Sequence, residues 1–183
     1  MAEQRVATIT AQLARLRPET FAHVRRVAAL AVRSARRARL PFELVNEVYW
    51  GALVHDVGEL NLRRALLDKP GVLSEAERAV MTEHTLIGAR WLGGVDGLDS
   101  LVPYARWHHE RFDGLGYPDG LPGHRIPVGV VVVSVCDAWD ALTQSRPYRE
   151  PLTHAAAVEE LQRHAGRQWS RAAVDWVLGA ANP

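Results

Sequence analysis

The feature that most constrains the fold is a set of ionisable residues placed on apolar stripes of helical period. His84, for example, interrupts a stripe formed by Val80, Ile87 and Trp91. Side chains three and four residues apart share one face of a helix, so this histidine faces the core with its apolar neighbours. Residues that lie on or beside such stripes in separate segments are His23, His55, Asp56, His84, His108, His109 and Asp137, and Glu19 shares a helix face with His23. Burying them unpaired is costly, and shared coordination of a metal removes that cost.

The available ligand types define the metal chemistry. The chain has eight histidines but a single cysteine, Cys136, which excludes an internal disulfide and a cysteine-based zinc site. Imidazole and carboxylate ligands suit iron, manganese, zinc or nickel. The adjacent pairs His55–Asp56 and His108–His109 can each reach a site that holds two ions, with Asp56 as the bridge.

Two metal ions about 3.5–4 Å apart favour in-line attack on phosphorus, since one ion activates water and the other stabilises the leaving oxygen. The residues therefore indicate a helical metallohydrolase of phosphate esters. The alternative is a set of hydrogen-bonded core histidines without metal. That alternative is our interpretation of the three histidines in polar contexts, His124, His154 and His164.

Composition excludes several other classes. Of the 183 residues, 48% are hydrophobic and 23% are charged, which rules out disordered and collagen-like chains. The net charge of +1 gives no bulk field for a nucleic-acid polymer. The arginines between Arg25 and Arg39 are interpreted as a solvated helix face. No apolar run approaches the ~20 residues of a membrane span, and the N-terminal segment does not resemble a signal peptide, so we expect a cytoplasmic protein without membrane partners.

Helix start and stop signals predict an all-α fold. Pro18 suits the first turn of a helix, Pro41 ends that helix, and Ser74 with Glu77 forms a capping box. The four consecutive valines that begin at Val130 favour a strand by propensity, but no second convincing strand could pair with it, so we predict a buried helix there. Expected helices span Glu3–Leu16, Pro18 to about Arg39, Pro41 to the His55–Asp56 pair, Ser74 to about Leu92, Asp99–His109, Val130 to about Leu142, Thr153–His164 and Ser170–Leu178.

One segment cannot form regular structure. Residues 113–129, DGLGYPDGLPGHRIPVG, contain five glycines and three prolines. Such density predicts a long shaped loop of the kind that often carries function. The expected architecture is a single helical domain interrupted by this loop.

Several motifs together resemble a known family. HDVGE at 55–59 resembles the signature of HD domains, and HHERFDGLGYPDGLPG at 108–123 resembles the extended motif of the HD-GYP subfamily. Further similar stretches are DKPGVL at 68–73, MTEHTLIGARWL at 81–92 and IPVGVVVVSVCDAWDALTQSRPYR at 126–149. Their order and spacing agree with the family from about Glu19 to Trp169. On this resemblance residues 18–183 are an HD-GYP-like domain, and residues 1–17 are an N-terminal helix of the same structural unit.

The resemblance implies a helical bundle and a bacterial signalling hydrolase. Its activity would be that of a cyclic di-GMP phosphodiesterase, yielding linear dinucleotide or GMP with two or three divalent ions, most often iron or manganese. The positions that match metal ligands of the family are His23, His55, Asp56, His84, His108, His109 and Asp137, with Glu19 matching the carboxylate of members that hold a third ion. The positions that match substrate-contacting residues are Asp113, Gly114, Gly116, Tyr117 and Pro118 in the loop, and Arg146 and Arg149 for the phosphates.

Two positions depart from the family. Lysine usually follows the HD-x-G tetrapeptide, but here Glu59 stands in its place. An anion beside a bound phosphate should weaken substrate binding or transition-state stabilisation, unless Glu59 lies at the surface, binds metal or carries a proton. The C-terminal pattern GRQWSR at 166–171 also differs, which should affect packing rather than chemistry.

The leading interpretation is a phosphodiesterase that acts on cyclic di-GMP or a close cyclic dinucleotide, with Asp56 and Glu59 as candidate catalytic residues. Two alternatives stay open. A binding or interaction module would keep the fold and metals but have weakened turnover, which Glu59 favours. Another HD-superfamily phosphohydrolase would act on mononucleotides or alarmones. Expected protein partners are a second copy of the chain or a regulatory signalling protein.

Overall fold

The structure is a computed structural model that describes residues 2–145 and 150–181. Within these ranges the chain forms helices and loops and contains no strand, which confirms the all-α prediction. Only two isolated bridges occur there, between Asp113 and Pro122 and between Ala165 and Trp169. No helix among the described residues is long and apolar enough to cross a membrane.

Most α-helices lie close to where the sequence places them. The N-terminal half contains α1 (Ala2–Leu16), α2 (Pro18–Arg37), α3 (Phe42–Val54), α4 (Arg64–Leu67) and α5 (Glu75–Gly93). The C-terminal half contains α6 (Val102–Trp107), α7 (Val128–Thr143), α8 (His154–His164) and α9 (Arg171–Ala181). Three short 3-10 helices connect them: η1 (Val57–Asn61), η2 (Asp99–Leu101) and η3 (Gly123–Arg125).

Local signals account for the agreement and for the differences. The predicted capping box starts α5, since Glu77 N donates to Ser74 Oγ and the Ser74 backbone donates to the Glu77 carboxylate. The valine-rich segment forms α7, as predicted from its lack of a pairing partner. The helix expected over Asp99–His109 is divided into η2 and α6. The sequence did not predict α4, η1 or η3, each of which has at most five residues.

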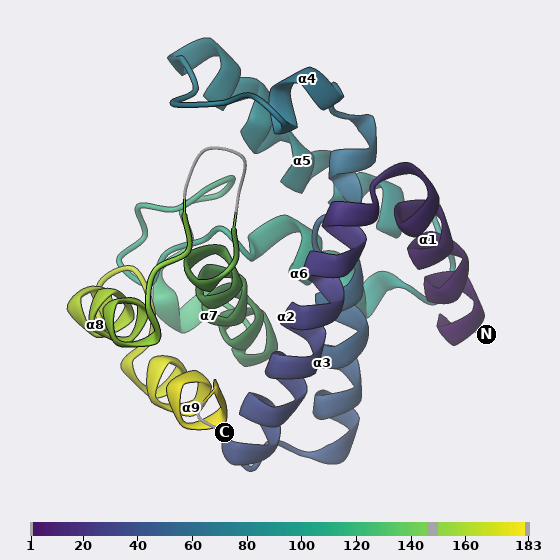
Figure 1. Ribbon diagram of the computed structural model, residues 1–183. Coiled ribbons are helices and arrows are strands. Elements are labelled where there is room, and N and C mark those ends of the chain that lie inside the picture. Colours follow the sequence, from purple (N-terminus) through teal and green to yellow (C-terminus); the bar gives the residue numbers. More distant parts are fainter. Residues whose placement is uncertain (1, 146–149, 182–183) are drawn as a thin grey trace.

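The fold is built around α2, which contacts α1, α3, α7 and α9 (Figure 1). Its buried face includes Val24, Val27 and Ala31, all below one per cent exposed. Helix α1 adds Val6, Ile9 and Leu13 to the same core cluster. The division at residue 17 between an N-terminal helix and the family-like domain stays a prediction.

One glycine permits a close approach that assembles the site. Gly58 in η1 lies directly against the backbone of α5, at the His84 carbonyl and the Gly88 amide. A side chain at Gly58 has no room there, because both neighbours are backbone atoms. The turn that follows α3 is thereby held against the helix that carries His84.

Candidate metal centre

Five segments deliver the histidines and carboxylates to one point inside the bundle. His23 comes from α2, His84 from α5 and Asp137 from α7. His55 is the C-cap of α3 with Asp56 directly after it, and His108 is the C-cap of α6 with His109 directly after it. The structure thus brings together seven of the eight proposed ligands, namely His23, His55, Asp56, His84, His108, His109 and Asp137.

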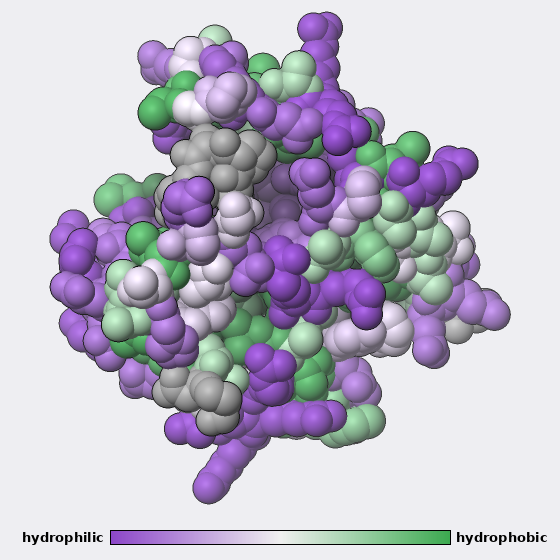
Figure 2. Space-filling model, in the orientation of Figure 1, coloured by the Kyte–Doolittle hydropathy of each residue, from purple (hydrophilic) through white to green (hydrophobic). Residues whose placement is uncertain are grey.

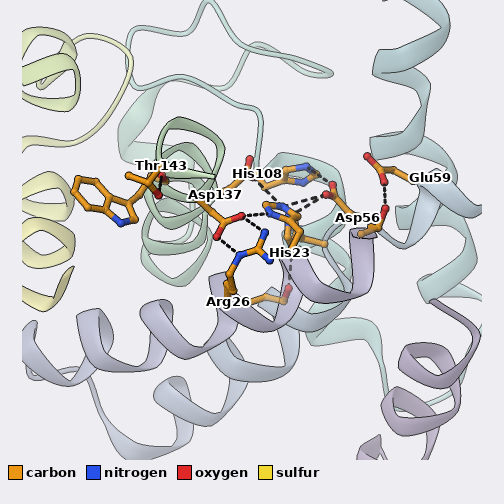
Figure 3. Close-up of polar contacts among 12 residues, drawn as sticks. His23, Arg26, Asp56, Glu59, His108, Asp137 and Thr143 are labelled. Atoms are coloured by element: carbon orange, nitrogen blue, oxygen red, sulfur yellow. Dashed lines mark hydrogen bonds and ion pairs between the residues drawn. The ribbon is translucent and has the colours of Figure 1, made fainter. Parts of the chain in front are cut away.

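Asp56 lies at the centre of the cluster, and each of its oxygens faces different histidines. Asp56 Oδ2 lies 3.5 Å from Nε2 of His23 and 3.4 Å from Nε2 of His55. Asp56 Oδ1 lies 3.6 Å from Nε2 of His84 and 3.4 Å from Nε2 of His108. Figure 3 shows Asp56 next to His23 and His108. This is the arrangement expected of a carboxylate that bridges two ions.

Two groups of three side chains lie on the two sides of Asp56. His23, His55 and Asp137 offer ligand atoms within 4.8 Å of one another, and so do His84, His108 and His109. We call these the aspartate-side trio and the histidine-side trio. His23 Nε2 lies 3.1 Å from Asp137 Oδ1, which closes the aspartate-side trio.

The tautomers of the histidines suit metal coordination. Nδ1 of His55 faces the Ala52 carbonyl at 2.8 Å, Nδ1 of His84 faces that of Met81 at 2.7 Å, and Nδ1 of His108 faces that of Tyr104 at 2.9 Å. Since a carbonyl only accepts, Nδ1 must donate its proton, which leaves Nε2 as a lone-pair donor pointing into the cluster.

Two observations at Nε2 indicate that a cation fits. His55 Nε2 is fully buried, and no described residue forms a hydrogen bond with it, although Asp56 Oδ2 lies 3.4 Å away. His84 Nε2 and His108 Nε2 lie 3.2 Å apart, so two lone pairs face each other unless a proton or a metal ion lies between them. The imidazole and carboxylate donor set matches the ligands that iron, manganese and zinc take in proteins.

The pKa values divide the cluster into charged and neutral parts. Burial alone would raise the pKa of Asp56, but His55, His108 and His23 hold it well below its usual range. Burial lowers the pKa of His23, yet hydrogen bonds that His23 donates to Asp137, Asp140 and Asp56 raise it well above the usual value. The centre can therefore hold positive charge next to Asp56 and Asp137.

In the histidine-side trio, two of the histidines have lowered pKa values. Burial lowers the pKa of His84 and, more strongly, that of His109, whose neighbour His108 lowers it further. These two imidazoles are neutral at neutral pH and thus available as ligands without loss of a proton.

Sequence reasoning missed a second layer behind His23. Asp140, which is 6% exposed, accepts a hydrogen bond from His23 Nδ1 at 2.7 Å and is paired with Arg26. Burial raises the pKa of Asp140, but His23 and Arg26 lower it to below its usual value. The available signal was spacing: Asp140 lies one helical turn after Asp137 on an apolar helix.

The glycine-rich loop is anchored beside the cluster. Glu110, which is 4% exposed, accepts hydrogen bonds from the backbone amides of Asp119 at 2.7 Å and Leu121 at 2.9 Å. Tyr117 stacks on His109, with ring centroids 4.9 Å apart. Burial raises the pKa of Tyr117, so its hydroxyl keeps its proton at neutral pH. The loop thus presents a phenol next to a proposed metal ligand.

Other predicted loop residues stabilise the conformation of the loop. Asp113 is paired with Arg111 at 2.7 Å and accepts from the Leu115 amide at 3.2 Å. Gly114 has a positive φ of 76°. Gly116 packs against the backbone of Glu110, where a side chain has no space.

Two predicted carboxylates lie outside the ligand groups. Glu19 is exposed in the first turn of α2 and belongs to none of the groups found among the described residues. Glu59 is half-buried, accepts a hydrogen bond from Thr20 Oγ1 at 2.7 Å, and lies beyond Asp56 on the side away from Asp137 (Figure 3). Burial, with Asp56 adding to it, raises the pKa of Glu59 to about 7. Arg146 and Arg149 lie outside the described residues.

The remaining histidines are away from the cluster. His124 is exposed in η3, and the His154 ring lies 5.1 Å from that of Trp139. His164 Nε2 lies 3.3 Å from Glu160. None of the three belongs to a ligand group within the described chain, but His124 and His154 are exposed and are therefore not the core histidines expected from the sequence.

The surface near the centre is polar and hollowed. Figure 2 shows a predominantly hydrophilic face with a recess between the upper end of α2 and the end of the molecule formed by α4 and α5. A charged ligand therefore meets polar side chains on this face.

Comparisons with known proteins agree with the geometry. The family model described as "HD domain" matches residues 8–172. A cyclic di-GMP phosphodiesterase of Thermotoga maritima is 35% identical over 87% of this chain and 44% of its own length. A cyclic di-GMP phosphodiesterase response regulator of Xanthomonas campestris is 38% identical over 87% of this chain and 43% of its own length. The chain thus spans less than half the length of these relatives.

Solved structures show the same fold. An HDG"Y"P protein from Bdellovibrio bacteriovorus superimposes with a TM-score of 0.72 at 20% identity, covering 88% of this chain and 52% of that one. The HD domain of the L. monocytogenes phosphodiesterase PgpH, in complex with cyclic-di-AMP, gives a TM-score of 0.68 at 17% identity over 95% of this chain and 96% of that one. The resemblance to HD-GYP proteins is confirmed.

Proposed function

The chain belongs to the HD domain family, and on that premise we propose that it is a metal-dependent phosphodiesterase. Its substrate would be cyclic di-GMP or a close cyclic dinucleotide, and its product the linear dinucleotide or GMP. The observation that carries the proposal is the position of Asp56, whose two oxygens face separate histidines and thereby join two trios of ligands. Relatives that are named as cyclic di-GMP phosphodiesterases support the choice of substrate.

Two divalent ions, iron or manganese, would occupy the centre. The aspartate-side trio would hold one ion and the histidine-side trio the other, with Asp56 shared between them. When bound, such ions supply Lewis acidity for in-line attack of water on phosphorus. Glu19, which is exposed and outside these groups, would be a ligand for a third ion.

The protein's own residues would bind and orient the dinucleotide. Tyr117, stacked on His109, would lie beside the substrate, and Asp113, Gly114, Gly116 and Pro118 would give the loop its shape. Arg146 and Arg149 would each pair a guanidinium with phosphate oxygens, because its fork of donors matches them.

Glu59 would carry a proton. Its pKa of about 7 means that it is partly protonated at neutral pH, as a general acid for a leaving oxygen must be. Thr20 donates to Oε2, which leaves Oε1 to bear the proton. Glu59 thereby offers an acid in place of the positive charge that lysine supplies elsewhere in the family.

The decisive test measures metal content and turnover together. Wild-type protein loaded with iron or manganese under reducing conditions is expected to hydrolyse cyclic di-GMP, and Asp56→Ala to lose both the ions and the activity. A metal-replete wild type that hydrolyses no cyclic dinucleotide would refute the proposal. A panel that includes mononucleotides and alarmones separates it from another HD-superfamily phosphohydrolase.

A second candidate function is a binding module with weakened turnover. The specific observation in its favour is the negative charge of ionised Glu59 next to Asp56, which opposes binding of a phosphate. This candidate predicts that Glu59→Lys gains activity over wild type, whereas a proton-carrying role predicts that the same change loses activity. A cytoplasmic location, and assembly with a second copy or a regulatory partner, form part of the overall proposal.

A further inference from the structure

We propose that Asp140 is a positioning residue that fixes the ring of His23. By doing so it makes the aspartate-side ion site bind metal more tightly than the histidine-side site. The inference rests on the proposed metal centre, but it concerns residues that lie behind the ligands. It predicts that the two ion sites are unequal and that Asp140 with Arg26 controls only one of them.

The contacts of Asp140 define its role. Oδ2 accepts the Nδ1 proton of His23 at 2.7 Å. Arg26 donates from Nε to Oδ1 at 2.7 Å and from Nη2 to Oδ2 at 2.8 Å. With both oxygens held by the guanidinium, the carboxylate cannot rotate away, and the proton of His23 stays on Nδ1. Figure 3 shows Arg26 and His23 on α2 pointing toward α7.

Three other histidines of the cluster have a different partner at Nδ1. His55, His84 and His108 each turn Nδ1 to a neutral backbone carbonyl within their own segment. A carboxylate behind a ligating imidazole raises its basicity more than a carbonyl does, because it also stabilises positive charge on the ring. His23 should therefore be the strongest electron donor among the four imidazoles.

This difference falls on one side of Asp56. The aspartate-side trio combines His23 with Asp137 and is backed by Asp140, so three carboxylates including Asp56 surround that position. Within the described part of the chain, Asp56 is the one carboxylate that lies close to His84 and His108 of the histidine-side trio. The aspartate-side position should bind a divalent ion more tightly.

Arg26 connects this arrangement to the surface. Its side chain is 42% exposed, whereas that of Asp140 is 8% exposed. Loss of the guanidinium leaves the Asp140 carboxylate buried with His23 as its remaining partner among the described residues, so the position and charge of Asp140 both depend on Arg26.

The test compares Asp140→Asn with a matched control. Glu160→Gln removes a carboxylate that also contacts an arginine, Arg163 at 2.9 Å, and a histidine, His164 at 3.3 Å, but on α8 and outside the ligand groups. Metal-free proteins are titrated with Mn²⁺ in equilibrium dialysis, and bound metal is counted by mass spectrometry. Circular dichroism melts of each variant verify that it is folded.

The expected result is selective. Wild type and Glu160→Gln should bind two Mn²⁺ ions with unequal dissociation constants, and Asp140→Asn should weaken the tighter one by about 10- to 100-fold. Unchanged affinities in a folded Asp140→Asn variant, or equal weakening of both, would overturn the inference. A wild type that binds no Mn²⁺ would instead refute the proposed metal centre.

A second measurement reports on His23 itself. In the zinc-loaded protein, long-range proton–nitrogen correlation spectra should show His23 with its proton on Nδ1 and a strongly downfield proton shift. Arg26→Gln, which removes only the guanidinium that holds Asp140, should move that shift and weaken the same site by a smaller factor. An unaltered His23 signal in both Asp140→Asn and Arg26→Gln contradicts the positioning role.

Discussion

Replacing Gly58 by alanine should dismantle the metal centre without touching a ligand. The added carbon would lie 2.8 Å from the Gly88 amide nitrogen and closer still to the His84 carbonyl oxygen. Ordinary contacts of such a carbon begin near 3.4 Å. Because both obstacles are backbone atoms of α5, and the carbonyl oxygen is the nearer one, the helix and the turn after α3 must separate by more than about one ångström.

The separation acts directly on the ligands. His84 lies on α5 and Asp56 lies two residues before Gly58, and their facing atoms are 3.6 Å apart. A metal site tolerates errors of only about 0.2 Å in its ligand distances. The histidine-side ion should therefore be lost first, and overpacking should lower the free energy of unfolding by about 3 kcal/mol.

The assay combines urea unfolding with a count of bound Mn²⁺. Gly93→Ala is the matched control, because it adds the same carbon to the end of α5, where the nearest atom, of Val102, lies 3.8 Å away. The control should retain wild-type metal content and stability to within about 1 kcal/mol. Wild-type metal binding by a folded Gly58→Ala protein would refute the reasoning.

Three further predictions follow from the loop, from Glu59 and from metal removal. Glu110→Gln keeps at most one of the two hydrogen bonds that the loop amides donate to Glu110, and it should lower the free energy of unfolding in urea by about 2–4 kcal/mol. The control Glu159→Gln, at an exposed position, should change it little. The pKa of Glu59 rises on folding from 4.5 to about 7, so its contribution to the stability of the metal-free protein is present below pH 4.5 and is lost as the pH rises through 7. Glu59→Gln should therefore stabilise metal-free protein at pH 8 by on the order of 2 kcal/mol, and by much less at pH 4.5, in thermal melts. A metal ion present at 100 times its dissociation constant stabilises the folded protein by about 2.7 kcal/mol for each site. A chelator removes this stabilisation and should therefore lower the midpoint of thermal unfolding. A midpoint that is the same with and without chelator contradicts the metal centre.

The helices were predictable because their signals are local. The capping box at Ser74 and the proline at Pro18 lie within one turn of the helix starts that they specify. The short η1 turn was not predictable, because it depends on the contact of Gly58 with α5, far along the chain.

The ligands of the centre could be predicted from histidines and carboxylates on apolar stripes, a pattern that is costly without a shared partner. The two-sided geometry of Asp56 needed coordinates, since it depends on the orientation of one side chain. Asp140 was missed because a single aspartate on a helix carries no sign of its partner, and its partners His23 and Arg26 lie more than 110 residues away.

The ends of α3 and α6 affect how metal ions and substrate bind at the cluster. Both helices finish at the cluster, with His55 and His108 as their C-caps, so the negative ends of their dipoles add to the charges of Asp56 and Asp137. These helix ends favour positive charge at the cluster, whether it is carried by protonated His23 or by a bound ion. We therefore expect bound ions to strengthen the binding of an anionic substrate, because they add positive charge to the cluster. The supply of metal ions would then affect substrate binding by this protein as well as its chemistry.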